Sequence, residues 1–421
     1  MKRFLVSIVI FLLCLGLTNS ALGTGEIKIG FLTALTGSLA SFGLPTDYSA
    51  RLAVDQINAA GGLLGCKVKL VTRDTGASPV VARDAITRLV KVDRVTACVG
   101  ALSSEVTAAT SSVTISHRIV QISPASTSPQ LTELDDRGFV FRTCPSDALQ
   151  GTIQGKLARN LGYETASILF VNNAYGKGIA ESFKSTFEKK KGKIIKIIPY
   201  DKGKASYREE VESVIRGKPD VLNIIGFPID GNNILLEAAG LGYRGKYIFA
   251  DGMKGDSVSQ GPASKYIDGS FGTALGTMEV KELKQFEEDY VDKLKCDGVN
   301  KRKIKDYMAM PFRTQSYDAV VLIALAIEKA GRGFLKMSPK NQGNAIRRNL
   351  ISIANPPGQE VLYGESGRAF RLLKEGRDIN YQGVSGPLTF DKNGDIREAA
   401  IVIWHIKDGK TLSVWTVNVN K

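Results

Sequence analysis

The sequence predicts an α/β protein of two similar lobes, each built around a doubly wound, mostly parallel sheet. Short segments typical of strands alternate with longer segments of helical periodicity along most of the chain. The alternation starts again near Asp147, although the amino-acid sequence does not repeat. The 421 residues, 43% of them hydrophobic and 23% charged, are ample for two globular lobes.

Five strands are expected in the first part of the chain. In the first of them Ile27, Ile29 and Phe31 alternate with other residues, which indicates a strand with one buried face. The fourth is an apolar run, followed by two prolines that stop both strands and helices. The expected strands are Glu26–Leu32, Lys67–Arg73, Val95–Val99, Ile119–Ile122 and Phe139–Thr143.

Helices are expected between these strands, and two prolines mark where they begin. A proline in the first turn of a helix costs no hydrogen bond, because its N–H would be unpaired there anyway. The first helix is therefore expected over Pro45–Ala60, with Gly61-Gly62 ending it. Ser78-Pro79 predicts the start of a second helix that reaches about Lys91, and a third follows Ser104.

The second round of the pattern begins with a helix that ends near Leu161-Gly162. The strands that follow are expected at Ala166–Val171, Lys193–Pro199, Val221–Ile225 and Lys246–Ala250. The helices between them are expected at Gly178–Lys190, Tyr207–Arg216 and Asp230–Leu241.

The last third of the chain is less regular. A basic stretch between Lys295 and Thr314 is expected to be irregular, and residues 331–382 to hold one clear helix, Gln342–Leu350, in a loose section. A hairpin is expected over Leu388–Ile396, built on Asn393-Gly394. The remaining elements are the strands Ser270–Leu275, Ala399–Trp404 and Thr411–Val417 and the helices Val280–Lys295 and Thr314–Ala330.

The first 23 residues are expected to form a secretory signal peptide. A basic start precedes the apolar run Phe4–Leu17, and Ala21-Leu22-Gly23 supplies small residues before the expected cleavage site. The apolar run is short for a membrane span. Bulky residues precede Cys14, which disfavours a lipid anchor there. We therefore expect an exported, soluble, periplasmic protein.

A formal net charge of +14 favours polyanions as partners, but the basic residues are spread along the chain. No nucleic-acid-binding module is recognisable, so a solvated basic face is the expectation. The motifs of α/β-hydrolases, P-loop nucleotidases, zinc proteases and dinucleotide-binding enzymes are missing from their expected places. No cluster of histidines or cysteines suggests a metal, and we expect no cofactor and no catalysis.

Four cysteines remain after the predicted cleavage: Cys66, Cys98, Cys144 and Cys296. An exported protein can oxidise them, and four cysteines allow three pairings. Cys66 opens one expected strand and Cys98 nearly ends another, so in a parallel sheet they lie on the order of 15 Å apart. The limit for Cα atoms in a disulfide is about 7 Å, which disfavours the pair Cys66–Cys98.

Two loops predict where a ligand binds. The strand before Gly100 ends in Ala101-Leu102-Ser103-Ser104, and the strand before Pro124 ends in Ala125-Ser126-Thr127-Ser128. Both loops are rich in small and hydroxyl-bearing residues. Loops that follow neighbouring parallel strands meet at one edge of a sheet, where open α/β folds bind ligands.

The whole set of segments resembles the substrate-binding proteins of branched-chain amino acid (Leu/Ile/Val-type) ABC importers, which have the type I periplasmic binding protein fold. The resemblance covers almost all of the chain after the leader. Its order and spacing are specific, although each segment alone is weak. The matching segments are Ile27–Gly43, Ala53–Gly65, Val99–Thr107, Ile122–Thr132, Phe141–Asp147, Tyr175–Gly178, Ala250–Gly252 and Gly386–Asp395.

The resemblance implies two lobes joined by a hinge, with the ligand in the cleft between them. We expect residues 24–146 and 276–400 to form lobe 1, and residues 147–275 and 401–421 to form lobe 2. It also implies that Ser104, Ala125 and Thr127 bind the ligand's carboxylate, because a carboxylate needs N–H and O–H donors. The acids Asp147 and Asp251 then bind its ammonium group.

Aromatic residues are expected around the rest of the ligand: Phe42, Tyr175 and Phe227. Phe42 and Phe227 lack the hydroxyl that relatives often have, and Asp251 is shorter than the glutamate often found there. The carboxylate site therefore matches the family better than the side-chain pocket does.

The expected function is delivery of an amino acid, branched-chain or otherwise apolar, to ABC permease subunits in the membrane by a monomeric protein. One alternative is the ligand-sensing domain of a regulatory system. Others are the binding of another small carboxylate, such as an aromatic acid, and an exported hydrolase.

Overall fold

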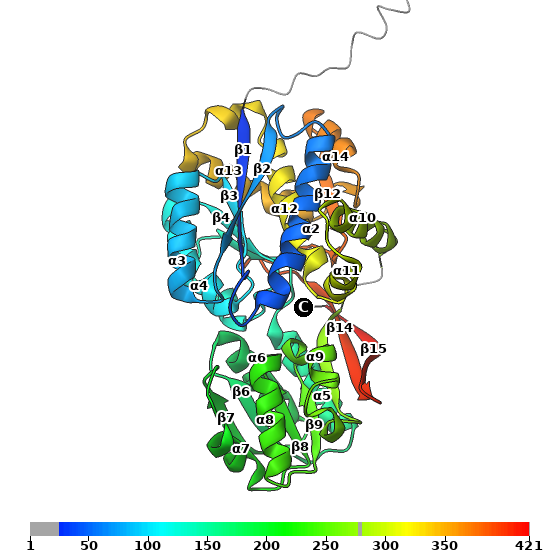
Figure 1. Cartoon of the computed structure of the whole chain (residues 1–421). Helices are drawn as coiled ribbons and strands as arrows, with labels where there is room; N and C mark the ends of the chain where they lie inside the picture. Colours follow the sequence, from blue (N-terminus) through cyan, green and yellow to red (C-terminus); the bar gives the residue numbers. More distant parts are fainter. Residues whose placement is uncertain (1–24, 277–279, 421) are drawn as a thin grey trace, which may run out of the picture.

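The computed structural model describes residues 25–276 and 280–420 and shows two lobes, one above the other in Figure 1. The predicted signal peptide lies outside the described residues. Each lobe holds one large sheet with helices on its faces, so the predicted two-lobed α/β fold is confirmed. The chain passes from one lobe to the other after β5 (Val140–Arg142), between β10 (Phe271–Gly276) and α10 (Leu283–Cys296), and before β14 (Glu398–Lys407).

The sheet of the first lobe has the order β2-β1-β3-β4-β5, and every neighbouring pair is parallel. Its central strands are buried on both faces, as expected for a parallel sheet between helices. All five carboxyl ends therefore point the same way, toward the second lobe (Figure 1). The strands are β1 (Glu26–Thr33), β2 (Lys67–Asp74), β3 (Ala97–Val99), β4 (Val120–Ser123) and β5 (Val140–Arg142).

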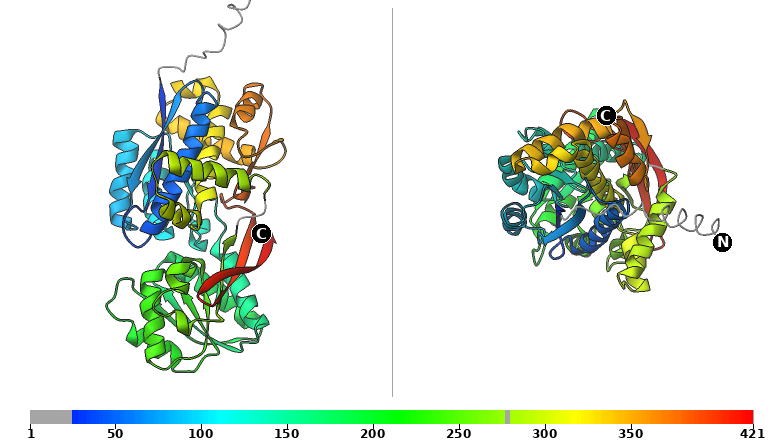
Figure 2. Two further views of the ribbon diagram at one scale, coloured as in Figure 1. Left: turned by 45° about the vertical axis from the view of Figure 1, so that its right-hand side comes forward. Right: turned by 90° about the horizontal axis from the view of Figure 1, so that it is seen from above.

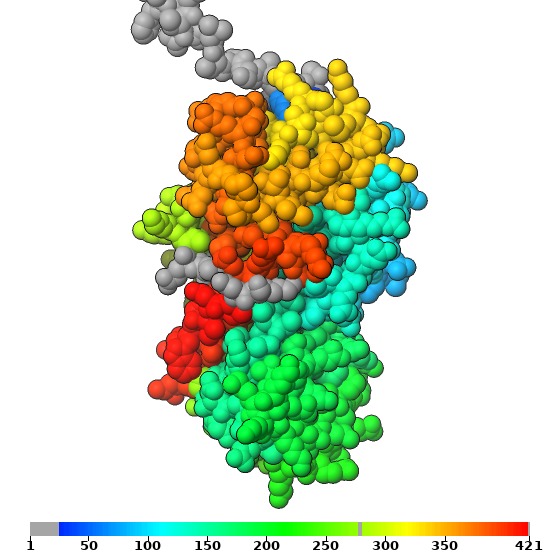
Figure 3. Space-filling view, turned by 180° about the vertical axis from the view of Figure 1, so that it is seen from behind, coloured from blue at the N-terminus to red at the C-terminus, as the bar shows by residue number. Residues whose placement is uncertain are grey.

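The helices of the first lobe come from both ends of the chain. The central one, α12, is buried along almost its whole length and packs against α2. Seen from behind, residues of the last third cover much of this lobe (Figure 3). The helices are α2 (Ala40–Ala59), α3 (Pro79–Arg88), α4 (Ser104–His117), α10 (Leu283–Cys296), α11 (Lys301–Met308), α12 (Arg313–Lys329), α13 (Pro339–Ala354) and α14 (Ser366–Lys374).

The sheet of the second lobe has the order β15-β14-β10-β9-β8-β6-β7. The pairs among β6 to β10 are parallel, whereas β14 and β15 are antiparallel and form a long ribbon at one edge (Figure 2). The strands are β6 (Thr165–Val171), β7 (Lys193–Tyr200), β8 (Val221–Ile225), β9 (Lys246–Phe249), β10 (Phe271–Gly276), β14 (Glu398–Lys407) and β15 (Lys410–Asn420). The main helices are α5 (Asp147–Asn160), α6 (Ala174–Lys189), α7 (Arg208–Ile215) and α8 (Pro228–Gly240).

Helix α2 begins a turn earlier than predicted, so Pro45 lies inside it. The N–H groups of Ala40 and Phe42 are paired with the carbonyls of Gly37 and Leu39, which starts the helix at Ala40. Proline removes only one intrahelical bond, and packing of this helix against the core outweighs that loss.

The predictions for the last third were wrong in three places. The basic stretch contains α11, which Asn300 caps at Lys303 and whose Ile304 packs on the core. Residues 331–382 hold α13, α14 and the strands β11 (Gln359–Val361) and β12 (Ile379–Gly383) instead of a single helix. In place of a two-stranded hairpin, the Asn-Gly turn has one isolated bridge, between Phe390 and Ile396. Short elements that depend on distant contacts leave little local pattern.

All four predicted mature cysteines are free thiols, three of them buried and Cys296 exposed. Cys98 lies level with Val71 across β1, because both are in register with Gly30. Cys66 precedes β2 by one residue, so it sits on the order of 15 Å farther along the strand direction. This register is the one that the argument against a Cys66–Cys98 bridge assumed.

Candidate functional site

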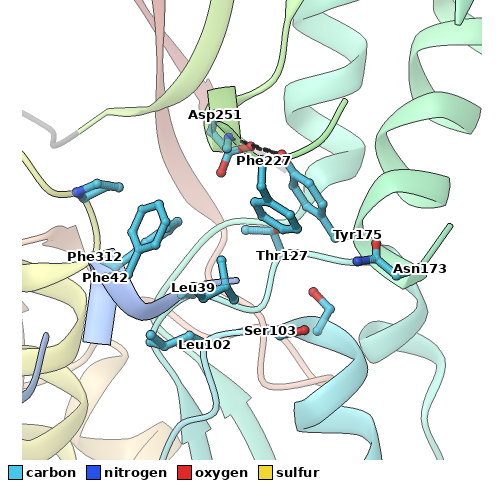
Figure 4. Close-up of a pocket in the computed structure, with 14 residues that line it drawn as sticks. Leu39, Phe42, Leu102, Ser103, Thr127, Asn173, Tyr175, Phe227, Asp251 and Phe312 are labelled. Carbon is cyan, nitrogen blue, oxygen red and sulfur yellow. Dashed lines mark hydrogen bonds between the residues drawn. The ribbon is translucent and has the colours of Figure 1, made fainter. Parts of the chain in front are cut away.

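A cleft of about 530 Å³, partly open to solvent, lies between the lobes where strands of both sheets end (Figure 4). The loops after β3 and β4, the start of α2 and the segment before α12 form its first-lobe wall, and the segments after β6, β8 and β9 form its second-lobe wall. The lining residues are Leu39, Phe42, Leu102, Ser103, Ser104, Ala125, Thr127, Asn173, Tyr175, Phe227, Asp251, Gly252, Pro311 and Phe312. Asp251 is the one charged residue among them.

The first-lobe wall presents hydrogen-bond donors. Ser104 is the first residue of α4, where backbone N–H groups are unpaired and the helix dipole favours an anion. Its hydroxyl oxygen accepts the backbone N–H of Ser128 at 3.1 Å. The hydroxyl proton of Ser104 has no acceptor among the described residues and remains for a ligand.

The loop of Ala125 and Thr127 is held from behind by a buried ion pair. Arg142 on β5 is 2% exposed and donates to Asp395 at 2.5 Å. The same guanidinium donates to the backbone carbonyls of Ser126 and Ser128, at 3.2 and 2.8 Å. These bonds fix the backbone of the loop, so its side chains are positioned before any ligand arrives.

The second-lobe wall carries Asp251, which follows β9. Its Oδ1 accepts the hydroxyl proton of Tyr175 at 2.8 Å and an amide proton of Gln150 at 3.0 Å. Burial raises the pKa of Asp251, while those two hydrogen bonds act in the opposite direction. The carboxylate thus has two donors and also faces the cleft (Figure 4).

Asp147 lies behind this wall and does not line the cleft. It is fully buried at the start of α5, and its Oδ2 accepts the hydroxyl proton of Thr127 at 2.7 Å. Its Oδ1 has no hydrogen-bond partner in the described structure. Burial, and secondarily the nearby charge of Asp251, raise the pKa of Asp147 well above its ordinary value.

Aromatic rings face each other from the two lobes. Phe42 and Phe312 lie on the first-lobe side, with ring centroids 6.3 Å apart. Tyr175 and Phe227 stack on the second-lobe side at 5.5 Å. Figure 4 shows the two pairs with the cleft between them. The walls are therefore largely apolar, and their polar groups are the serine and threonine hydroxyls of the first lobe and Asn173, Tyr175 and Asp251 of the second.

Seven of the eight predicted site residues line this cleft, and Asp147 is the exception. Sequence reasoning missed Phe312, Asn173 and Gln150. Phe312 comes from the basic stretch that was predicted to be irregular, so no pattern pointed to it. Gln150 follows Asp147 by three residues, a spacing that places both on one face of α5 and could have identified it.

The lobes also touch directly beside the cleft. The hydroxyl of Ser128 donates to the carbonyl of Ala174 at 2.8 Å, and Lys202 pairs with Glu105 at 2.9 Å. These contacts join the loop after β4 to the start of α6, and the start of α4 to the loop after β7.

Comparison with known proteins identifies the family. A family model described as "Periplasmic binding protein" matches residues 26–401. The chain belongs to the periplasmic binding protein family. Among the relatives of this periplasmic binding protein is the Leu/Ile/Val-binding protein BraC3 of Rhizobium johnstonii, 28% identical over 85% of this chain and 94% of its own. The chemotactic signal transduction system substrate-binding protein BasB of Halobacterium salinarum is 27% identical, over 86% and 82%.

Solved structures agree. The branched-chain amino acid transporter substrate-binding protein LivJ of Streptococcus pneumoniae, in complex with isoleucine, has a TM-score of 0.72 and 25% identity, and the match covers 94% of this chain and all of LivJ. The resemblance to Leu/Ile/Val-type binding proteins of type I fold is thus confirmed. No helix among the described residues of this periplasmic binding protein is long and apolar enough to cross a membrane.

Proposed function

We propose that this protein is a periplasmic, monomeric solute-binding protein of an ABC importer, which closes on an apolar amino acid and presents it to the permease without catalysing a reaction. In this proposal Ser104, Thr127 and the free N–H groups of their loops bind the carboxylate. Asp251 binds the ammonium group. The rings of Phe42 and Phe227 contact the apolar side chain.

One observation carries the proposal: donors suited to a carboxylate in one lobe face an acid in the other, across apolar walls. A zwitterion matches this arrangement, because each of its charged ends meets a group of the opposite kind. A ligand that touches both lobes also binds the closed form more tightly than the open form, and this difference drives closure. The names of the amino acid-binding relatives support the same ligand class.

A second candidate is an aromatic carboxylate, which the four rings in the walls favour. Such a ligand leaves Asp251 without a counter-charge in a cleft that excludes water when closed, and this is costly. A sensory role remains the alternative to transport, and the name of the Halobacterium relative favours it.

Calorimetry with matched ligands tests the proposal. We expect L-leucine to bind at least tenfold more tightly than 4-methylpentanoate, which has the same carbon skeleton without the amino group. Equal binding of the two would make the ligand a simple carboxylate. Tighter binding of benzoate than of any amino acid would favour the aromatic candidate.

A further inference from the structure

Thr127 has too few hydroxyl protons for the two acceptors that it would meet at the cleft. A threonine hydroxyl has a single proton to donate. In this structure that proton goes to Oδ2 of Asp147, at 2.7 Å. A ligand carboxylate at Thr127 needs the same proton, so an ionised Asp147 and a ligand carboxylate compete for it.

We propose that Asp147 is a positioning residue that holds a proton when a carboxylate ligand is bound, donating it to Thr127 Oγ1 so that Thr127 donates to the ligand. In this chain of hydrogen bonds Asp147 donates to Thr127, and Thr127 donates to the ligand carboxylate. This inference deepens the proposed function and, for its ligand-dependent part, rests on it. It assigns Asp147 a role other than binding the ammonium group directly.

The surroundings indicate which of the two acids holds the proton. Asp251 is the better placed of the two acids to carry the charge, because Tyr175 and Gln150 both donate to it and it reaches the cleft. Asp147 accepts one side-chain hydrogen bond, is fully buried, and leaves Oδ1 without a partner. An ion is costly in such a place, whereas a neutral carboxyl group costs far less.

Among the other charged or titratable groups around Asp147, the positive charge of Arg142 acts to lower the pKa of Asp147, but no direct bond joins the two side chains in the described structure. Arg142 on β5 is bonded to Asp395 and to two backbone carbonyls. Tyr175 on α6 donates to Asp251, and Cys144 is a buried thiol. The N-terminus of α5 favours a negative charge on Asp147, but the pKa of Asp147 is nevertheless raised, with burial as the main cause.

The first experiment measures the affinity for L-leucine from pH 5 to pH 8.5, in wild type and in Asp147→Asn. In wild type we expect the affinity to fall up to tenfold per pH unit once free Asp147 ionises. The asparagine amide donates to Thr127 at every pH, so Asp147→Asn should keep its affinity at high pH. Asp256→Asn, at an exposed position, is the matched control and should follow wild type.

Two results would overturn the inference. One is the same alkaline fall in wild type and Asp147→Asn. The other is a loss of affinity in Asp147→Asn at all pH values, which would mean that a charged Asp147 contacts the ammonium group.

A second experiment needs no ligand and separates this inference from the proposed function. An unfolded aspartate loses its proton near pH 4, while folded Asp147 keeps its own to higher pH. The folded state then binds more protons, so the free energy of unfolding decreases as pH rises above 4. Urea unfolding should show this decrease in wild type and a smaller one in Asp147→Asn.

The difference between the two proteins reports on Asp147 and on its electrostatic interaction with Asp251. Burial raises the pKa of Asp318 to about 6, and this acid contributes equally to both curves. Parallel curves would show that Asp147 holds no proton in the folded protein. Failure of leucine to bind, with diverging curves, would overturn the proposed function alone.

Discussion

At the residue scale, Ser104 offers a hydroxyl proton that no other described residue accepts. Ser104→Ala should lower the affinity for L-leucine by roughly tenfold or more, since a hydrogen bond to a charged group contributes about 1.5–3 kcal/mol. Titration calorimetry measures this. Ser112→Ala on the exposed side of the same helix serves as control, and equal affinities in both variants would place the carboxylate elsewhere.

Asp251 is the residue that should decide between amino acids and simple acids. Asp251→Asn removes the charge and keeps the shape, so the preference for L-leucine over 4-methylpentanoate should shrink. Most of that change should come from weaker binding of leucine. A competition titration on both proteins shows the ratio, and an unchanged ratio would mean that the ammonium group lies outside the reach of Asp251.

At the scale of elements, the ion pair between Arg142 and Asp395 ties the loop after β4 to the turn before β14. Arg142→Met removes the buried guanidinium that pairs with Asp395, and breaking a buried ion pair should cost about 3–5 kcal/mol of unfolding free energy. The loop also loses its backbone contacts, so ligand affinity should fall. Urea unfolding and calorimetry measure the two effects.

A surface pair is the control for this change. Arg88 and Asp84 form an exposed pair within α3, and Arg88→Met should alter stability by less than about 0.5 kcal/mol. A similarly small effect of Arg142→Met would show that the loop holds its shape without the pair.

Elements with a strong local pattern were predictable, and those that depend on distant partners were not. The apolar runs of β1 to β9 gave their strands to within a few residues, and so the loops at their ends were placed correctly. Helix α11 was missed because its apolar residues are few among lysines, and only contact with the core reveals its inner face. Phe312 follows the segment of that helix, so its place in the cleft was not predicted either.

The candidate site shows the same division. The residues that line the cleft from strand ends were found through chain order and a family resemblance. The hydrogen bond between Thr127 and Asp147 could not be predicted, because it depends on how the start of α5 is oriented relative to the loop after β4. Sequence indicates which groups come near one another, whereas donor and acceptor roles require coordinates.

At the scale of the whole molecule, the first lobe cannot be completed by the first part of the chain. A protein ending at Gly276 lacks α12, whose residues Val320 and Ile323 are fully buried in the core with β1 to β5. We expect hydrogen exchange to show no protection in β1 to β5 of this fragment, but protection in β6, β8 and β9. Protected β1 to β5 amides would mean that the early strands need no late helix.

The buried position of α12 also determines when the first lobe can fold as the chain is synthesised. The strands of the first-lobe sheet are made first but are covered late, since the central helix α12 emerges after β6 to β10 are complete, while the second sheet then lacks only its edge strands β14 and β15. Until then the apolar faces of β1, β3 and β4 stay open to solvent and to other chains. The second lobe can begin to fold while the first lobe still lacks its central helix. Protection from aggregation therefore matters most for residues 26–142, during the synthesis of roughly the next 180 residues.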